Sequence, residues 1–295
     1  MINGKIWLSS PTMHGDEMKY IQEAFDTNWV VPLGPNVNAF EDDLKHFVGQ
    51  NKEVVALSAG TAAIHLGLIQ LGVSTGDEVI CQSFTFCASA NPVTYQGATP
   101  VFIDSEEDTW NMDPVALEKA FEMYPEVKVV VVAHLYGTSG KIDEIRAICR
   151  EHHAIIIEDA AESLGASYKG VQIGTFGSYN AISFNGNKII TGSSGGMLLT
   201  DDLEAANKVR KWSTQSRENA PWYQHEELGY NYRMNGVVTR EGDGRGKMNA
   251  YYIAGGVKGK DGKPLAGAAK TSFIKKCQAD IKAACEAKAV SESEL

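Results

Sequence analysis

The chain has 295 residues, of which 43% are hydrophobic and 22% charged, and its formal net charge is -10 at pH 7. This length can bury a sizeable core, so we expect one large domain and a smaller one. The negative net charge argues against nucleic acid as a partner, because proteins bind the phosphates of nucleic acids mainly through Lys and Arg. No apolar run approaches the roughly 20 residues that span a bilayer. The first eleven residues do not resemble a secretory signal, so we expect a cytoplasmic protein.

The cysteines indicate neither a disulfide framework nor a metal site. Their number is odd, they are scattered, and none forms a CxxC pair. We therefore expect reduced thiols and no bound metal. The cysteines are Cys81, Cys87, Cys149, Cys277 and Cys285.

Taken in chain order, the first predicted elements are helices at residues 15–25 and 38–48. From about residue 52 to residue 213, β-branched runs then alternate with helix-like stretches, which is typical of an α/β layered domain. Some of these runs are apolar without alternation, so we expect a mostly parallel central sheet with helices on both faces. The predicted strands are residues 54–59, 78–82, 100–104, 127–134, 154–159, 179–184 and 196–200.

The composition changes after Met234. The segment that follows is rich in Gly, Ala and Lys, with a helix-like stretch at residues 268–289. We predict a large domain at residues 1–234 and an atypical C-terminal segment at residues 235–295, which contains too few apolar residues for a second large core.

Lys188 lies in a glycine-rich loop directly after a predicted strand, within the run SFNGNK that begins at Ser183. A lysine amine attacks a carbonyl only when burial or nearby cations lower its pKa, and such a loop can provide those surroundings. The alternative is an ordinary surface lysine, which is the more common case.

Asp159 follows the apolar run at residues 155–157. An acid at the carboxyl end of a parallel strand faces the crevice where α/β sheets bind ligands. In an enzyme that uses pyridoxal 5'-phosphate (PLP), such an acid keeps the pyridine nitrogen protonated. The alternative is a helix N-cap, a position that Asp favours.

Two further features are weaker when taken alone. The turn at residues 58–62, SAGTA, leads from a strand into a helix, and a helix start with small residues can bind a phosphate. A plain tight turn is the alternative. Phe86 can stack on an aromatic ring, although a single Phe usually belongs to a core.

In combination and in this order, these features resemble the DegT/DnrJ/EryC1/StrS family of PLP-dependent nucleotide-sugar aminotransferases. The resemblance covers residues 5–234. It includes GATPVF at 97–102, HLYG at 134–137, GTFG at 174–177 and GYNYRM at 229–234. It implies the aspartate-aminotransferase-like fold of type I PLP enzymes.

The resemblance also implies a role for each site residue. Lys188 holds PLP as a Schiff base, and Asp159 contacts the pyridine nitrogen. Phe86 stacks on the ring, and Glu162 lies near the phenolic oxygen. The phosphate is bound by Gly60, Thr61 and Ser183 and by Asn231 of a neighbouring subunit, which requires a homodimer.

The runs at residues 158–163 and 183–191 are similar to those of the subgroup that aminates UDP-linked 4-keto-6-deoxy amino sugars for surface glycans or protein glycosylation. The amino donor that is usual in the family is glutamate. One alternative is a PLP-binding homologue with no or impaired catalysis, because the match ends at Met234 and the family's second domain is missing from it. The family's sugar dehydratases lack the Schiff-base lysine that is present here. A nicotinamide-binding protein is disfavoured, because its GxGxxG turn is absent.

Overall fold

The computed structural model describes residue 15 and residues 17–49 and 51–237. The chain divides into two units, Met1–Asp243 and Gly244–Leu295. The second unit, with the helix predicted at residues 268–289, lies outside the described residues. The predicted domain boundary at Met234 stays a prediction. Within the part of the chain that the structure describes, none of the helices has the length and apolar character needed to cross a membrane.

The core of the described chain is a seven-stranded sheet in the order β1-β9-β8-β5-β4-β2-β3. The pairs β2–β3, β2–β4, β4–β5 and β5–β8 are parallel, whereas β9 runs antiparallel to both β1 and β8. The mostly parallel sheet is therefore confirmed, and each of its strands lies within two residues of its predicted bounds. The strands are β1 (Glu53–Leu57), β2 (Glu78–Gln82), β3 (Thr99–Ile103), β4 (Val129–Ala133), β5 (Ile155–Asp159), β8 (Tyr179–Ser183) and β9 (Gly196–Thr200).

A second, two-stranded sheet pairs β6 (Ser167–Tyr168) with β7 (Val171–Gln172). We did not predict it, because two residues are too few to show an alternating pattern.

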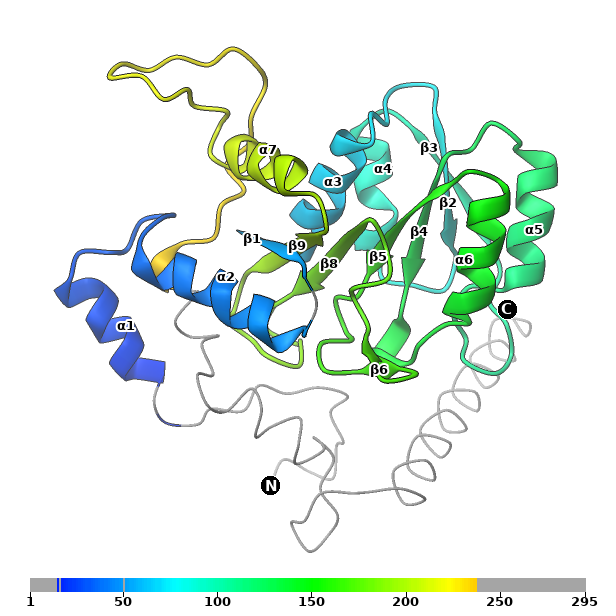
Figure 1. The fold of residues 1–295 in the computed structure, drawn as a ribbon, viewed down its shortest axis with the longest axis horizontal. Helices are drawn as coiled ribbons and strands as arrows, with labels where there is room; N and C mark the ends of the chain where they lie inside the picture. The colour runs from blue at the N-terminus through cyan, green and yellow to red at the C-terminus, as the bar shows by residue number, and fades with distance from the viewer. Residues whose placement is uncertain (1–14, 16, 50, 238–295) are drawn as a thin grey trace, which may run out of the picture. The chain divides into compact units, whose positions relative to one another are not determined.

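Helices cover both faces of the large sheet (Figure 1). The helices are α1 (Glu17–Asp26), α2 (Pro35–Phe47), α3 (Gly60–Gln70), α4 (Asn91–Tyr95), α5 (Pro114–Met123), α6 (Ile142–Glu151) and α7 (Leu203–Ser213), with 3-10 turns η1 (Cys87–Ser89) and η2 (Leu135–Gly137). One core cluster joins the sheet to α3, α4 and α7, and the other joins it to α5 and α6.

Strand β4 shows why the apolar runs do not alternate. Val129 and Val131 pack in the α3 cluster, whereas Val130 and Val132 pack in the α5–α6 cluster. Successive side chains of a strand point to opposite faces, so a strand with two covered faces is apolar throughout. On β5, Ile157 belongs to the α3 cluster and Ile156 to the other.

The edge strand β1 is fixed by a buried carboxylate. Glu41 of α2 accepts the backbone N–H of Ala56 and pairs with Arg210 and Arg233. The segment that carries Arg233 also pairs with the end of β1. These contacts satisfy a donor of the edge strand and hold the turn that follows β1 in place.

Candidate active site

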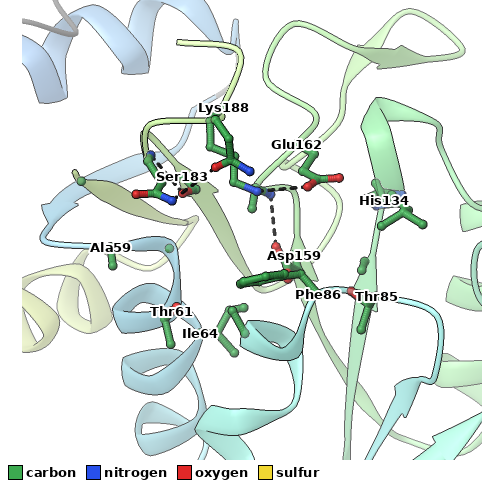
Figure 2. A pocket seen from close by; sticks show the side chains of 18 of the residues that line it. Ala59, Thr61, Ile64, Thr85, Phe86, His134, Asp159, Glu162, Ser183 and Lys188 are labelled. Atoms are coloured by element: carbon green, nitrogen blue, oxygen red, sulfur yellow. Dashed lines mark hydrogen bonds and ion pairs between the residues drawn. The ribbon is translucent and has the colours of Figure 1, made fainter. Parts of the chain in front are cut away.

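A cavity of about 280 Å³ opens where the carboxyl ends of β1, β2, β4, β5 and β8 meet. Parallel strands bring the residues that follow them to one edge of the sheet, so segments far apart in the sequence converge there (Figure 2). Seven of the eight predicted site residues line this cavity. They are Gly60, Thr61, Phe86, Asp159, Glu162, Ser183 and Lys188.

One end of the cavity is formed by the start of α3. Ala59, the N-cap residue, is extended and its side chain makes no capping hydrogen bond. The first N–H groups of a helix lack partners within the helix and attract anions. A Cβ on Gly60 would lie 3.1 Å from Cβ of Ser183, so the glycine allows these two segments to approach closely. Gly60, Thr61 and Ser183 together suit a phosphate group.

Lys188 points into the same cavity from the loop that follows β8 (Figure 2). Its side chain is only 10% exposed, which does not fit an ordinary surface lysine. The Nζ atom lies 3.1 Å from Oε1 of Glu162 and 5.9 Å from the ring centroid of Phe86. The sequence led us to expect burial or a neighbouring cation; the structure shows burial and a carboxylate partner.

Glu162 is held from two sides. Oε1 pairs with Lys188, and Oε2 accepts the backbone N–H of Tyr136 at 2.8 Å. Tyr136 has a left-handed backbone, with φ of 53°. Non-glycine residues adopt this conformation only when their surroundings favour it, and such residues concentrate at functional sites. The sequence did not identify Tyr136 as a contact of Glu162.

Asp159 lies at the carboxyl end of β5 and is only 7% exposed. Oδ2 accepts the hydroxyl of Ser89 at 2.6 Å, and Oδ1 accepts the backbone N–H of Ala161 at 3.1 Å. Burial raises the pKa of Asp159, while those two hydrogen bonds and the charge of Lys188 oppose that rise. No helix begins at Asp159, so its N-cap alternative is wrong.

Phe86 is 66% exposed and lines the cavity beneath Lys188, so it is not a core residue. Its ring therefore presents a face on which a planar group can stack.

Asn231 does not line this cavity. It is exposed and forms a bridge with Thr214. The predicted contact of Asn231 with a neighbouring subunit stays a prediction.

A buried pair beside the cavity was not found from the sequence. His134 follows β4, and its Nε2 atom lies 3.0 Å from Oε1 of Glu158, with both side chains fully buried. The backbone N–H of Gly140 donates to Nδ1 of His134, so a neutral ring carries its hydrogen on Nε2, the nitrogen that lies near the carboxylate. The sequence pattern that could have indicated this pair is the position of His134 directly after the all-apolar strand β4.

The cavity residues fit PLP. An uncapped helix start with Ser183 suits the phosphate, the face of Phe86 suits the ring, the buried carboxylate of Asp159 suits a ring N–H, and the amine of Lys188 is within the cavity to bind the aldehyde. These groups all line the same cavity.

Comparison with known proteins is consistent with this fit. EpsN of Bacillus subtilis, which is named as a pyridoxal phosphate-dependent aminotransferase, is 54% identical over 242 residues, 81% of this chain and 62% of EpsN. A GDP-perosamine synthase of Caulobacter vibrioides is 40% identical over 81% of this chain and 63% of its own length. This chain thus spans less than two thirds of the length of these curated relatives.

Solved structures give the same result for the fold. The PLP form of Spr1654 from Streptococcus pneumoniae, named as a sugar aminotransferase, matches with a TM-score of 0.77 and 26% identity over 84% of this chain and 67% of that chain. This confirms the aspartate-aminotransferase-like fold. The family model of the DegT/DnrJ/EryC1/StrS aminotransferases matches residues 11–239. The chain therefore belongs to the DegT/DnrJ/EryC1/StrS aminotransferase family, whose aminotransferases depend on PLP.

Proposed function

We propose that this chain carries the PLP site of an aminotransferase that moves an amino group from glutamate to a nucleotide-linked 4-keto-6-deoxy sugar in the cytoplasm, for surface glycan or protein glycosylation. The observation that supports it best is the position of Lys188. Its buried amine lies over the Phe86 ring and beside Glu162, in the same cavity as the buried carboxylate of Asp159.

When bound, PLP supplies an aldehyde that binds amines and a ring that accepts the electrons of a broken C–H bond. The residues supply binding and proton transfer. Lys188 would hold the cofactor, and its freed amine would move the proton of the donor's α-carbon through the Nζ atom. Oε1 of Glu162, 3.1 Å from Nζ of Lys188, would keep this amine in position within the cavity. Asp159 would accept a hydrogen bond from the ring N–H, and Gly60, Thr61 and Ser183 would bind the phosphate.

For the nucleotide we propose UDP, on the basis of the runs at residues 158–163 and 183–191. GDP is the second candidate, because relatives that are 34–40% identical are named GDP-perosamine synthases. In both candidates the group proposed to react is a ketone of the sugar.

We further propose a homodimer in which Asn231 of each subunit reaches the phosphate in the other. Asn231 is exposed and outside the cavity of its own chain, as that role requires. The large PLP domain is proposed to end near Met234. The alternative function is that of a PLP-binding homologue with no or impaired catalysis.

The test is an amination assay with purified protein, glutamate, and UDP-, GDP- or dTDP-linked 4-keto-6-deoxy sugars. We expect a product whose mass shows that the ketone has become an amine, formed fastest from the UDP sugar. Faster product formation from the GDP sugar would reverse the nucleotide assignment. PLP binding without product from any sugar would favour the non-catalytic homologue.

A further inference from the structure

A buried serine contacts the acid that the proposed function places at the ring nitrogen. Ser89 is the last residue of η1 and is fully buried. Its Oγ atom lies 2.6 Å from Oδ2 of Asp159. The hydroxyl of Thr85, a cavity-lining residue, lies 2.8 Å from the same Oγ. Figure 2 shows Thr85, Phe86 and Asp159 together at the cavity.

The hydrogens of this chain of groups can be assigned by counting donors. An ionised carboxylate only accepts hydrogen bonds, and a serine hydroxyl has one hydrogen to donate. While Asp159 is ionised, Ser89 therefore donates to Oδ2, and Thr85 must donate to Ser89. Oδ1 accepts the N–H of Ala161. Each carboxylate oxygen has one donor from the protein and keeps capacity for a donor in the cavity.

The same turn also fixes the stacking residue. The backbone N–H of Ser89 donates to the carbonyl of Phe86 at 3.1 Å. The segment 85–89 thus connects the ring face of Phe86 with the carboxylate of Asp159 through hydrogen bonds that lie within one short turn.

We propose that Ser89, with its hydroxyl oriented by Thr85, is a positioning residue that holds the Asp159 carboxylate in place as the acceptor for a ring N–H in the cavity. This inference rests on the role proposed for Asp159. The charged groups near Asp159 are Lys188 and Glu162, and the side chain of His134 is directed to Glu158. Ser89 is the side-chain hydroxyl that contacts Asp159 directly.

The experiment compares Ser89→Ala and Thr85→Val with wild type. Ser213→Ala is the matched control, because Ser213 is also fully buried and its hydroxyl donates to a backbone carbonyl, that of Arg210. Each change is made alone and together with Asp159→Asn. Two quantities are measured on the full chain: the dissociation constant of PLP, and the melting temperature of the PLP-free protein across pH.

We expect Ser89→Ala to weaken PLP binding about tenfold, the effect of losing one hydrogen bond to a charged group. In the PLP-free protein, the loss of stability linked to ionisation of Asp159 should move upward by about one pH unit, because the ionised form loses a donor. Thr85→Val should change both quantities in the same direction by less. Both effects should disappear in the Asp159→Asn background.

Two results distinguish failure of this inference from failure of the proposed function. If Asp159→Asn itself leaves PLP affinity unchanged, the role of Asp159 is wrong. If Asp159→Asn weakens PLP binding but Ser89→Ala behaves like Ser213→Ala, or keeps its full effect without Asp159, the role of Asp159 stands and Ser89 is not its positioning residue.

Discussion

Glu158 and Asp159 are neighbours on β5, and both are buried, yet the two faces of the strand give them opposite properties. Glu158 points toward the α5–α6 face, lies 3.0 Å from Nε2 of His134, and accepts hydrogen bonds from the backbone N–H groups of residues 174, 176 and 177. Asp159 points toward the α3 face and accepts hydrogen bonds from Ser89 and Ala161.

The pKa values follow from this difference. Burial alone would raise the pKa of Glu158, but the hydrogen bonds from His134 and from the backbone outweigh burial and hold that pKa below its ordinary value. Burial raises the pKa of Asp159, and its fewer donors do not reverse the rise. A carboxylate whose acceptor capacity is filled serves structure, whereas one with capacity left in a cavity can receive a ligand.

The largest expected effect comes from removing the structural carboxylate. Glu158→Ala removes the buried partner of His134 and the acceptor of the backbone N–H groups of residues 174 and 176, so the free energy of unfolding should fall by about 3–5 kcal/mol. Denaturant titration measures it. Glu122→Ala, an exposed change at the end of α5, should stay within about 0.5 kcal/mol. If both variants lose the same free energy of unfolding, Glu158 does not have this structural role.

Asp159→Asn should separate function from stability. We expect the half-reaction with the amino donor to slow on the order of a hundredfold or more, because the ring N–H loses its charged partner. The PLP-free protein should be no less stable at neutral pH, because a buried charge is gone. Stopped-flow absorbance and thermal melting give the two quantities, with the exposed Asp42→Asn as control. If Asp159→Asn lowers the melting temperature but leaves the half-reaction rate unchanged, Asp159 serves stability and not function, contrary to its contrast with Glu158.

The two carboxylates should also respond to pH with opposite signs. The folded pKa of Asp159 is raised above 3.8, so its contribution to stability is fully present below 3.8 and is lost as pH rises through the folded pKa. The folded pKa of Glu158 is below 4.5, so its contribution is present above 4.5 and is lost as pH falls through the folded pKa. Subtracting the melting curves of Asp159→Asn and Glu158→Gln from that of the PLP-free wild type isolates each titration. If the two melting-temperature differences change in the same direction with pH, the opposite pKa shifts of Asp159 and Glu158 are wrong.

The smallest effect concerns the ring face. Phe86→Leu keeps an apolar side chain but loses ring stacking, so the dissociation constant of PLP should rise about three- to tenfold. Phe84→Leu is the matched control, since Phe84 packs near Trp110 and does not line the cavity. If both variants bind PLP equally well, Phe86 does not stack on the ring.

The sequence predicted the sheet well, because apolar runs such as that of β4 depend only on covered faces. It also identified Lys188, Asp159 and Glu162, which lie at or just after the ends of β5 and β8 and line the same cavity. It did not find the contacts of Ser89 or Tyr136. Those depend on a side-chain direction and on a left-handed backbone, which arise only once the loops have packed together.

The central claim is that Lys188 binds the cofactor in this cavity. Incubation of the purified protein with PLP, reduction with borohydride and peptide mapping by mass spectrometry tests it directly. The account predicts a reduced PLP adduct on the peptide that contains Lys188, with none in Lys188→Ala. An adduct at Lys141 or Lys211, two lysines that pair with carboxylates elsewhere on the chain, or an unchanged adduct in Lys188→Ala, would contradict it.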